Sequence, residues 1–155
     1  MHMFIPAGCI LIDMAWFERP QPELGTEDQI VARRVVAILI DLILIGVVTS
    51  VLGSVLARVG LAAVGSLLAL VLTFGYYIYL EGTYGQTIGK MALGLVVVTE
   101  DGGDIDYKPA AIRTVLRIVD VLPVLYLLGF IVVLVTDRKQ RIGDLVANTV
   151  VVREA

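Results

Sequence analysis

The chain has 155 residues and a mass of 16.8 kDa, which leaves room for one domain. Hydrophobic residues make up 58% and charged residues 17%, whereas a soluble domain is about 45–50% apolar and about 25% charged. Because a soluble protein this small cannot bury so much apolar surface, we expect a membrane protein. The net charge of −3 argues against a nucleic-acid-binding protein, and one cysteine with one histidine excludes an internal disulfide and a Cys/His metal site.

Residues 1–28 are predicted to be an N-terminal leader and linker. The stretch 1–17 is fairly apolar but lacks the basic region of a signal peptide, and Met1 and Met14 both remain candidates for the start. Residues 18–28 contain two prolines, a glycine and four acidic residues, a composition typical of a solvated linker. A membrane domain is expected over 29–155.

Two apolar stretches are each long enough to span a membrane. Residues 35–57 are apolar apart from Asp41 and a few hydroxyl side chains, and 59–80 carry no charge. About 20 apolar residues suffice for a spanning helix. Because the connection around Arg58 and Gly60 is very short, the two spans should form an antiparallel hairpin.

Two short runs rich in β-branched residues, 95–99 and 149–153, are predicted to be strands. Isolated strand edges leave backbone groups unpaired, so we expect the two to pair on one side of the membrane. Basic residues concentrate before the first span and after the second, which places the N-terminus and residues 81–117 in the cytoplasm of a multi-pass cell-membrane protein.

A third hydrophobic segment covers about 118–136. Its uncharged part, 121–136, would be about 24 Å long as a helix, short of the roughly 30 Å hydrocarbon core, and Pro123 should kink or break it. A simple third span would place the basic cluster at 138–141 outside, against the positive-inside rule. We therefore favour a broken or re-entrant segment, which needs burial in protein and hence a homo-oligomer.

Asp41 is the sharpest chemical signal, since a carboxylate within a lipid helix costs about 2.5–3.5 kcal/mol and is usually functional or paired. Arg34 lies two turns earlier on nearly the same helix face. The same spacing recurs between Arg113 and Asp120, although apolar segments match by coincidence easily, and Arg117 is placed to pair with Asp120. Asp41, with Asp120, is either an ion or proton carrier or a structural polar clasp between helices.

The glycine-rich stretch 81–90 is predicted to be a turn at the membrane surface that uses Glu81, Gln86, Thr87 and Lys90. It lacks the spacing of a phosphate-binding P-loop. Lys90 is suited to meet either lipid phosphates or Glu81.

A dense charged patch at 137–144 contains Arg141 and Asp144. It is either a solvated cytoplasmic face or a salt-bridged gate in which Asp144 faces Arg34. If these two residues pair, exchanging their charges should restore folding. No nucleophile–base pair, metal cluster or cofactor motif is visible, so we expect neither an enzyme nor a cofactor.

Three blocks carry a family resemblance: Arg33 to Asp41, Gly85 to Lys90, and Gln140 to Thr149. In this order they resemble RDD-domain membrane proteins over roughly residues 28–153. The family is named for one arginine and two aspartates, which the resemblance assigns to Arg34, Asp41 and Asp144. Asn148 replaces the glycine that is usual in the last block, a change in a turn residue.

The resemblance implies a small integral membrane domain, with transport widely suggested and sodium–proton antiport proposed for some members. We therefore expect an all-α membrane protein with two short cytoplasmic strands, with lipid and monovalent cations as partners and transport as its function. The main alternative is a non-enzymatic scaffold or accessory subunit whose buried charges specify assembly. A third interpretation is a lipid-binding or stress-related membrane module that uses the basic surface residues.

Overall fold

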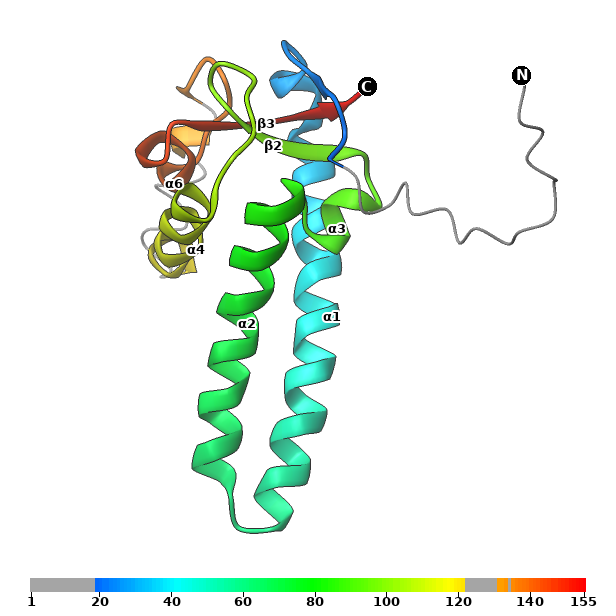
Figure 1. Ribbon diagram of the computed structural model, residues 1–155, viewed down its shortest axis with the longest axis vertical. Coiled ribbons are helices and arrows are strands. Elements are labelled where there is room, and N and C mark those ends of the chain that lie inside the picture. The colour runs from blue at the N-terminus through cyan, green and yellow to red at the C-terminus, as the bar shows by residue number, and fades with distance from the viewer. Residues whose placement is uncertain (1–18, 122–130, 134) are drawn as a thin grey trace, which may run out of the picture.

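A computed structural model describes residues 19–121, 131–133 and 135–155 of the chain, and the side chains of 118–121 lie outside this description. The described part of the chain is mostly helical, with a few short strands (Figure 1). Its elements in chain order are β1 (Pro22–Glu23), η2 (Glu27–Ile30), α1 (Val31–Arg58), α2 (Ala62–Tyr84), α3 (Ile88–Met91), β2 (Leu95–Thr99), α4 (Tyr107–Val121), α6 (Ile142–Val146) and β3 (Thr149–Glu154).

The helices α1 and α2 form the long antiparallel hairpin that the sequence predicts (Figure 1). Gly60 adopts φ +79° in the tight turn between them, a conformation that costs glycine little. Just beyond the turn, a Cβ at Gly65 would lie 3.3 Å from the Cα of Gly53 on α1, so small residues let the two backbones approach closely. Both helices are long and apolar enough to cross a membrane.

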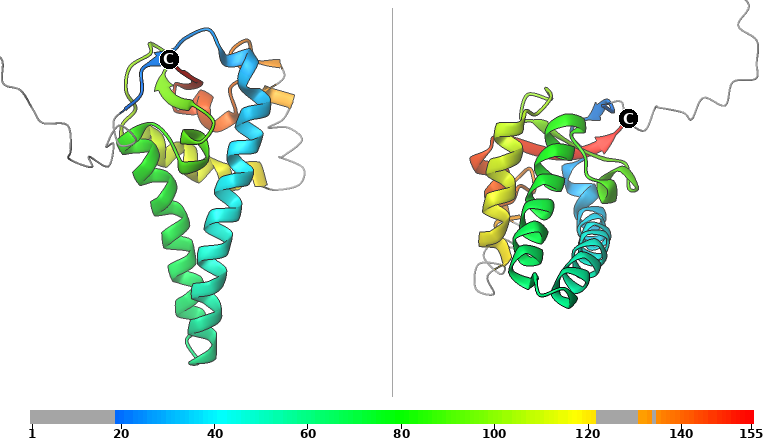
Figure 2. Two further views of the ribbon diagram at one scale, coloured as in Figure 1. Left: turned by 90° about the vertical axis from the view of Figure 1, so that its right-hand side faces the viewer. Right: turned by 60° about the horizontal axis from the view of Figure 1, so that its bottom comes forward.

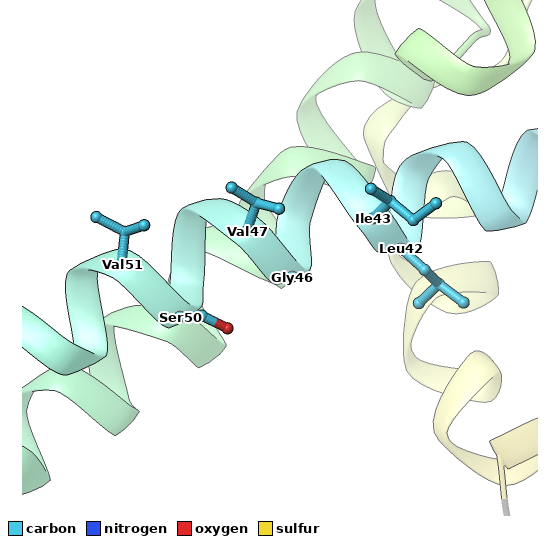
Figure 3. A pocket seen from close by; sticks show the side chains of 6 residues that line it. All are labelled: Leu42, Ile43, Gly46, Val47, Ser50 and Val51. Atoms are coloured by element: carbon cyan, nitrogen blue, oxygen red, sulfur yellow. The ribbon is translucent and has the colours of Figure 1, made fainter.

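The apolar surface of the hairpin stays uncovered. Only 11% of the most apolar window of each helix is buried within the protein, whereas the core helix of a soluble protein would be mostly buried. Ile43 on α1 and Leu67 on α2 are 67% and 62% exposed. Figure 3 shows this open surface on α1, where Ile43, Val47 and Val51 project from one face of the helix. Such a surface is stable in lipid and not in water.

The other elements gather at the end of the hairpin where α1 begins and α2 ends, and we call them the head (Figures 1 and 2). Its sheet has the order β1-β3-β2, with β2 and β3 antiparallel in the register Val97 opposite Val151. The predicted pairing of the two strands is therefore confirmed. Helix α3 packs on α1, α4 packs on α2, and α6 packs on α4.

Residues 19–28 belong to the head, although their composition predicts a solvated linker. Pro22 and Glu23 pair with the end of β3, and the Arg19 guanidinium donates to the backbone oxygens of Gly82, Thr83 and Ile105. A two-residue strand gives no periodic pattern, so composition alone did not reveal this packing.

The third hydrophobic segment falls largely outside the described residues. Its first residues, 118–121, continue α4, a helix that begins at Tyr107. Pro123 and the rest of 122–130, together with 134, are not described, nor are residues 1–18 of the leader. Whether the segment spans the membrane or re-enters it therefore stays a prediction.

Candidate functional site

Asp41 is buried at the junction of three helices and accepts three hydrogen bonds. Its side chain lies on α1 at 2% exposure. The Tyr76 hydroxyl on α2 donates to Oδ1 at 2.7 Å, the Thr87 hydroxyl donates to Oδ2 at 2.6 Å, and the Gly89 amide on α3 donates to Oδ1 at 2.8 Å. None of the ion pairs among the described residues includes Asp41. Its charge is thus held by hydroxyls and an amide rather than by a basic side chain.

The glycine-rich stretch after α2 creates this arrangement. Gly85 ends α2 in a left-handed conformation, φ +70°. The Thr87 hydroxyl oxygen then caps the N-terminus of α3 by accepting a hydrogen bond from the Lys90 amide. A Cβ at Gly89 would collide with the backbone oxygen of Ala37. Only glycine therefore lets α3 lie close enough to α1 for its amide to reach Asp41.

Helix geometry gives the depth of Asp41 in the hairpin. Arg58 ends α1 beside the turn, and at 1.5 Å per residue Asp41 lies about 25 Å from it along the axis. A hydrocarbon core about 30 Å thick that starts at the turn would include Asp41 near its far boundary. On the same count Arg34 lies about 36 Å from the turn, beyond that boundary and in the head.

Glu81, near the end of α2, is fully buried among three basic side chains. Lys90 Nζ lies 2.6 Å from Oε1, Arg113 Nε lies 3.2 Å from Oε2, and Arg117 lies 3.3 Å from Oε1. Arg117 also stacks over the Tyr77 ring at 3.8 Å, a cation–π contact. Of the two partners predicted for Lys90, the structure shows Glu81, and Lys90 itself is only 3% exposed.

Asp144, on α6, joins α1 to α4. Arg34 lies 2.5 Å from its Oδ2, Arg113 lies 2.9 Å from its Oδ1, and the Arg141 amide donates to Oδ2 at 3.1 Å. Desolvation raises the pKa of Asp144, but the charges of Arg113, Arg34 and Arg141 together outweigh it and hold this pKa far below its ordinary value. The carboxylate therefore stays ionised at any physiological pH.

The two arginines of the repeated Arg–Asp spacing meet at one carboxylate. Arg34 and Arg113 both bind Asp144, whereas the side chain of Asp120 lies outside the described residues. Arg117, which the sequence places beside Asp120, reaches Glu81, and its predicted pair with Asp120 stays a prediction. The predicted facing of Asp144 and Arg34 is what the structure shows.

One predicted site residue is buried rather than at the surface, and two further residues of the site were not predicted. Gln86, predicted at the membrane surface, is 3% exposed and donates to the Leu95 backbone oxygen and to Glu154. Tyr76 was not singled out, because a tyrosine in an apolar run carries no special pattern. Thr149 accepts a 2.6 Å hydrogen bond from Arg113, and strand β3 gave no sign of that role.

These features define a small helical domain with two helices apolar enough to span a membrane and a polar head at one end. The sequence matches the RDD family over residues 30–148, which is most of the chain, and the protein belongs to this family. No curated protein and no solved structure matches it. Family membership and the two apolar helices fit a membrane protein.

Proposed function

We propose that the protein is an integral membrane transporter that exchanges a monovalent cation, sodium foremost, for a proton at Asp41. One observation carries the proposal. Asp41 is a buried carboxylate on a helix long and apolar enough to span a membrane, and its described partners are two hydroxyls and one amide. The other two fully buried carboxylates of the described chain, Glu81 and Asp144, are neutralised by basic side chains.

The chemistry of the partners supports exchange. A hydroxyl group donates one hydrogen bond and carries two acceptor lone pairs. Tyr76 and Thr87 can therefore donate to the free carboxylate, or rotate and offer oxygen lone pairs to a cation. Hard cations prefer such oxygen ligands. Asp41 can then hold either a proton or a cation, and competition between them for one carboxylate couples their movements.

Arginine partners would prevent this exchange. A guanidinium stays protonated in proteins and compensates a carboxylate permanently. Arg34 lies two turns from Asp41 in sequence, but its guanidinium is bound to Asp144 and to the Lys139 backbone oxygen. Arg34, the buried basic residue nearest to Asp41 in sequence, is therefore bound to other groups and does not pair with Asp41.

The proposal includes an assembly and an orientation. We place the head and the N-terminus in the cytoplasm, in agreement with the basic residues before α1 and after α2. We also propose a homo-oligomer, because two helices with so little buried surface do not enclose a pathway by themselves.

A scaffold or accessory subunit is the second candidate. It is supported by the same three hydrogen bonds, because a fully satisfied Asp41 also serves as a polar clasp between α1, α2 and α3. In that case Asp41 holds the helices together and binds no ion.

Ion flux in proteoliposomes separates the two candidates. Wild type, Asp41→Asn and the control Asp104→Asn would be compared for sodium-dependent proton movement at matched folding. In Asp41→Asn the new amide could still accept from Tyr76 and Gly89 and donate to the Thr87 hydroxyl, so the fold should persist. Asp104 is exposed and pairs with Arg19 at the surface of the head.

We expect sodium-dependent flux in wild type and Asp104→Asn, and background flux in Asp41→Asn. Flux that survives in Asp41→Asn would contradict the role of Asp41. Background traces for folded wild type would contradict transport of sodium or protons and favour the scaffold.

A further inference from the structure

In one cluster of the head, positive charge exceeds negative charge among the described residues. Two carboxylates, Glu81 and Asp144, lie among five basic side chains, each of which contacts one of them or lies close enough to feel its charge. These basic residues are Arg34, Lys90, Arg113, Arg117 and Arg141. Arg34, Lys90 and Arg113 are buried, and Arg117 and Arg141 are half-buried. Withdrawing a charge from water is costly unless it is paired, so this excess of cations favours a further anion.

Loss of a proton relieves only part of this excess. Burial lowers the pKa of Lys90 to about 7 even though the charge of Glu81 raises it, so this lysine can become neutral. Arginine stays charged. Four guanidinium groups then still face the two carboxylates.

Arg141 is the member of this cluster whose guanidinium lacks an acceptor among the described residues. Its backbone amide binds Asp144, and its side chain takes part in none of the hydrogen bonds or ion pairs of the described part of the chain. Burial, followed by the charge of Arg34, lowers the pKa of Arg141 to about 10, although Asp144 raises it. Arg141 thus adjoins the carboxylate that Arg34 and Arg113 bind, and its own guanidinium has no acceptor among the described residues.

The two carboxylates of the cluster, Glu81 and Asp144, already bind other basic groups. Oδ1 of Asp144 binds Arg113, and its Oδ2 binds Arg34 and the Arg141 amide. Arg117 is committed to Glu81 and the Tyr77 ring. No described carboxylate accepts from the Arg141 guanidinium, so an acceptor for it would come from outside these residues.

We propose that the Arg141 guanidinium, in the positive field of Arg34 and Arg117, binds a phosphate-type oxyanion. A guanidinium presents a planar fork of N–H donors that matches two phosphate oxygens, and such charge-assisted pairs are among the strongest hydrogen bonds in proteins. Arg141 is half-buried and the Arg117 side chain is 20% exposed, so an anion can reach the cluster from the surface. The site is separate from Asp41 and does not depend on transport.

Two sources of this oxyanion fit the surroundings. The cluster lies in the head, just beyond the boundary of the hydrocarbon core estimated above, where lipid headgroups lie. Leu145 and Val146, which follow Arg141 on α6, are 39% and 58% exposed, as suits contact with lipid. A free phosphate ion offers the same chemistry from the aqueous side.

The test uses the full-length protein in two arms. In neutral detergent, inorganic phosphate is titrated against potassium chloride of equal ionic strength, and the unfolding temperature is followed. In nanodiscs, phosphatidylcholine alone is compared with phosphatidylcholine mixed with phosphatidylglycerol or phosphatidic acid. Wild type is compared with Arg141→Gln and with Arg138→Gln. Arg138 is an exposed residue in the neighbouring loop, so the control removes the same charge at the surface.

We expect wild type and Arg138→Gln to be stabilised by phosphate, by the anionic lipid or by both. In Arg141→Gln the affinity for the anion should be lower by about tenfold or more. Stabilisation in detergent identifies a soluble ion, and stabilisation only in nanodiscs identifies a headgroup. Without anion, Arg141→Gln should unfold at the same temperature as wild type or a higher one, since it relieves repulsion; a purely structural arginine would do the opposite. The proposal is overturned if neither anion stabilises wild type, or if Arg141→Gln responds as wild type does.

Discussion

Replacing Asp144 by asparagine tests the ion-pair cluster that joins α1, α4 and α6. The change keeps the shape of the side chain but leaves Arg34 and Arg113 without their shared carboxylate. Both arginine side chains are nearly fully buried, at 6% and 3% exposure, so water cannot replace the lost anion. Removing one partner of a buried pair costs about 3–5 kcal/mol. At roughly 2–4 °C per kcal/mol for a chain of this size, the unfolding temperature should fall by about 10 °C.

The assay is thermal and denaturant unfolding in detergent, with Asp104→Asn as the control. Asp104 lies 3.3 Å from Arg19 and its side chain is 76% exposed. The same substitution there should cost less than about 1 kcal/mol. Combining Asp144→Asn with Arg34→Gln in a double-mutant cycle should give a coupling of about 1–3 kcal/mol. A loss in Asp144→Asn no larger than that of the control would refute the reasoning.

The structure changes the design of this experiment. The sequence suggests exchanging the charges of Arg34 and Asp144. Arg113 Nη1, however, lies 2.9 Å from Asp144, so an arginine introduced at 144 would face Arg113. Exchange should therefore fail to restore stability even though Arg34 and Asp144 do pair, and the double-mutant cycle is the informative test.

Two further predictions concern α3. Gly89→Ala should lower the free energy of unfolding by about 1–3 kcal/mol, because its Cβ would collide with the Ala37 backbone oxygen. The control Gly46→Ala, at a position with open space on α1, should be neutral or mildly stabilising. Equal effects of the two substitutions in denaturant unfolding would contradict the close packing of α3. Since burial lowers the pKa of Lys90 to about 7 and an unfolded lysine titrates near 10.4, the unfolded chain binds more protons between these values. Stability should rise from pH 7 to 9 by at most about 1.4 kcal/mol per unit, and an unchanged slope in Lys90→Gln would exclude this lysine as the cause.

The hairpin and the pairing of the two strands could be predicted because each depends on a local pattern. The runs 35–57 and 59–80 are long, apolar and joined by a very short turn, and membrane-spanning length leaves few other structures open to them. The strands 95–99 and 149–153 are both rich in valine, and neither is stable without a partner. Proximity then followed from the need for hydrogen bonds.

The partners of the charged residues could be predicted only in part. The sequence pointed to Asp41, Asp144 and Arg34 as important, and it suggested that the last two face each other. It did not reveal that Tyr76 reaches Asp41 or that Arg113 shares Asp144, because both contacts depend on how α2 and α4 pack in three dimensions. Residue spacing reports which side chains share a helix face, and it says little about which other helix meets that face.

The three acidic residues of the site differ in what holds their charge, and that difference divides their roles. Arg113 contacts both Glu81 and Asp144, so these two carboxylates form one continuous cluster whose arginines keep it ionised. The two carboxylates of this cluster resist protonation, and the cluster is suited to fixing the head on the hairpin. Asp41 lies outside it, in contact with hydroxyls whose hydrogen bonds can reverse direction. Of the three, Asp41 is therefore the carboxylate that the proposed exchange would use, because the ion pairs that hold the head would remain intact.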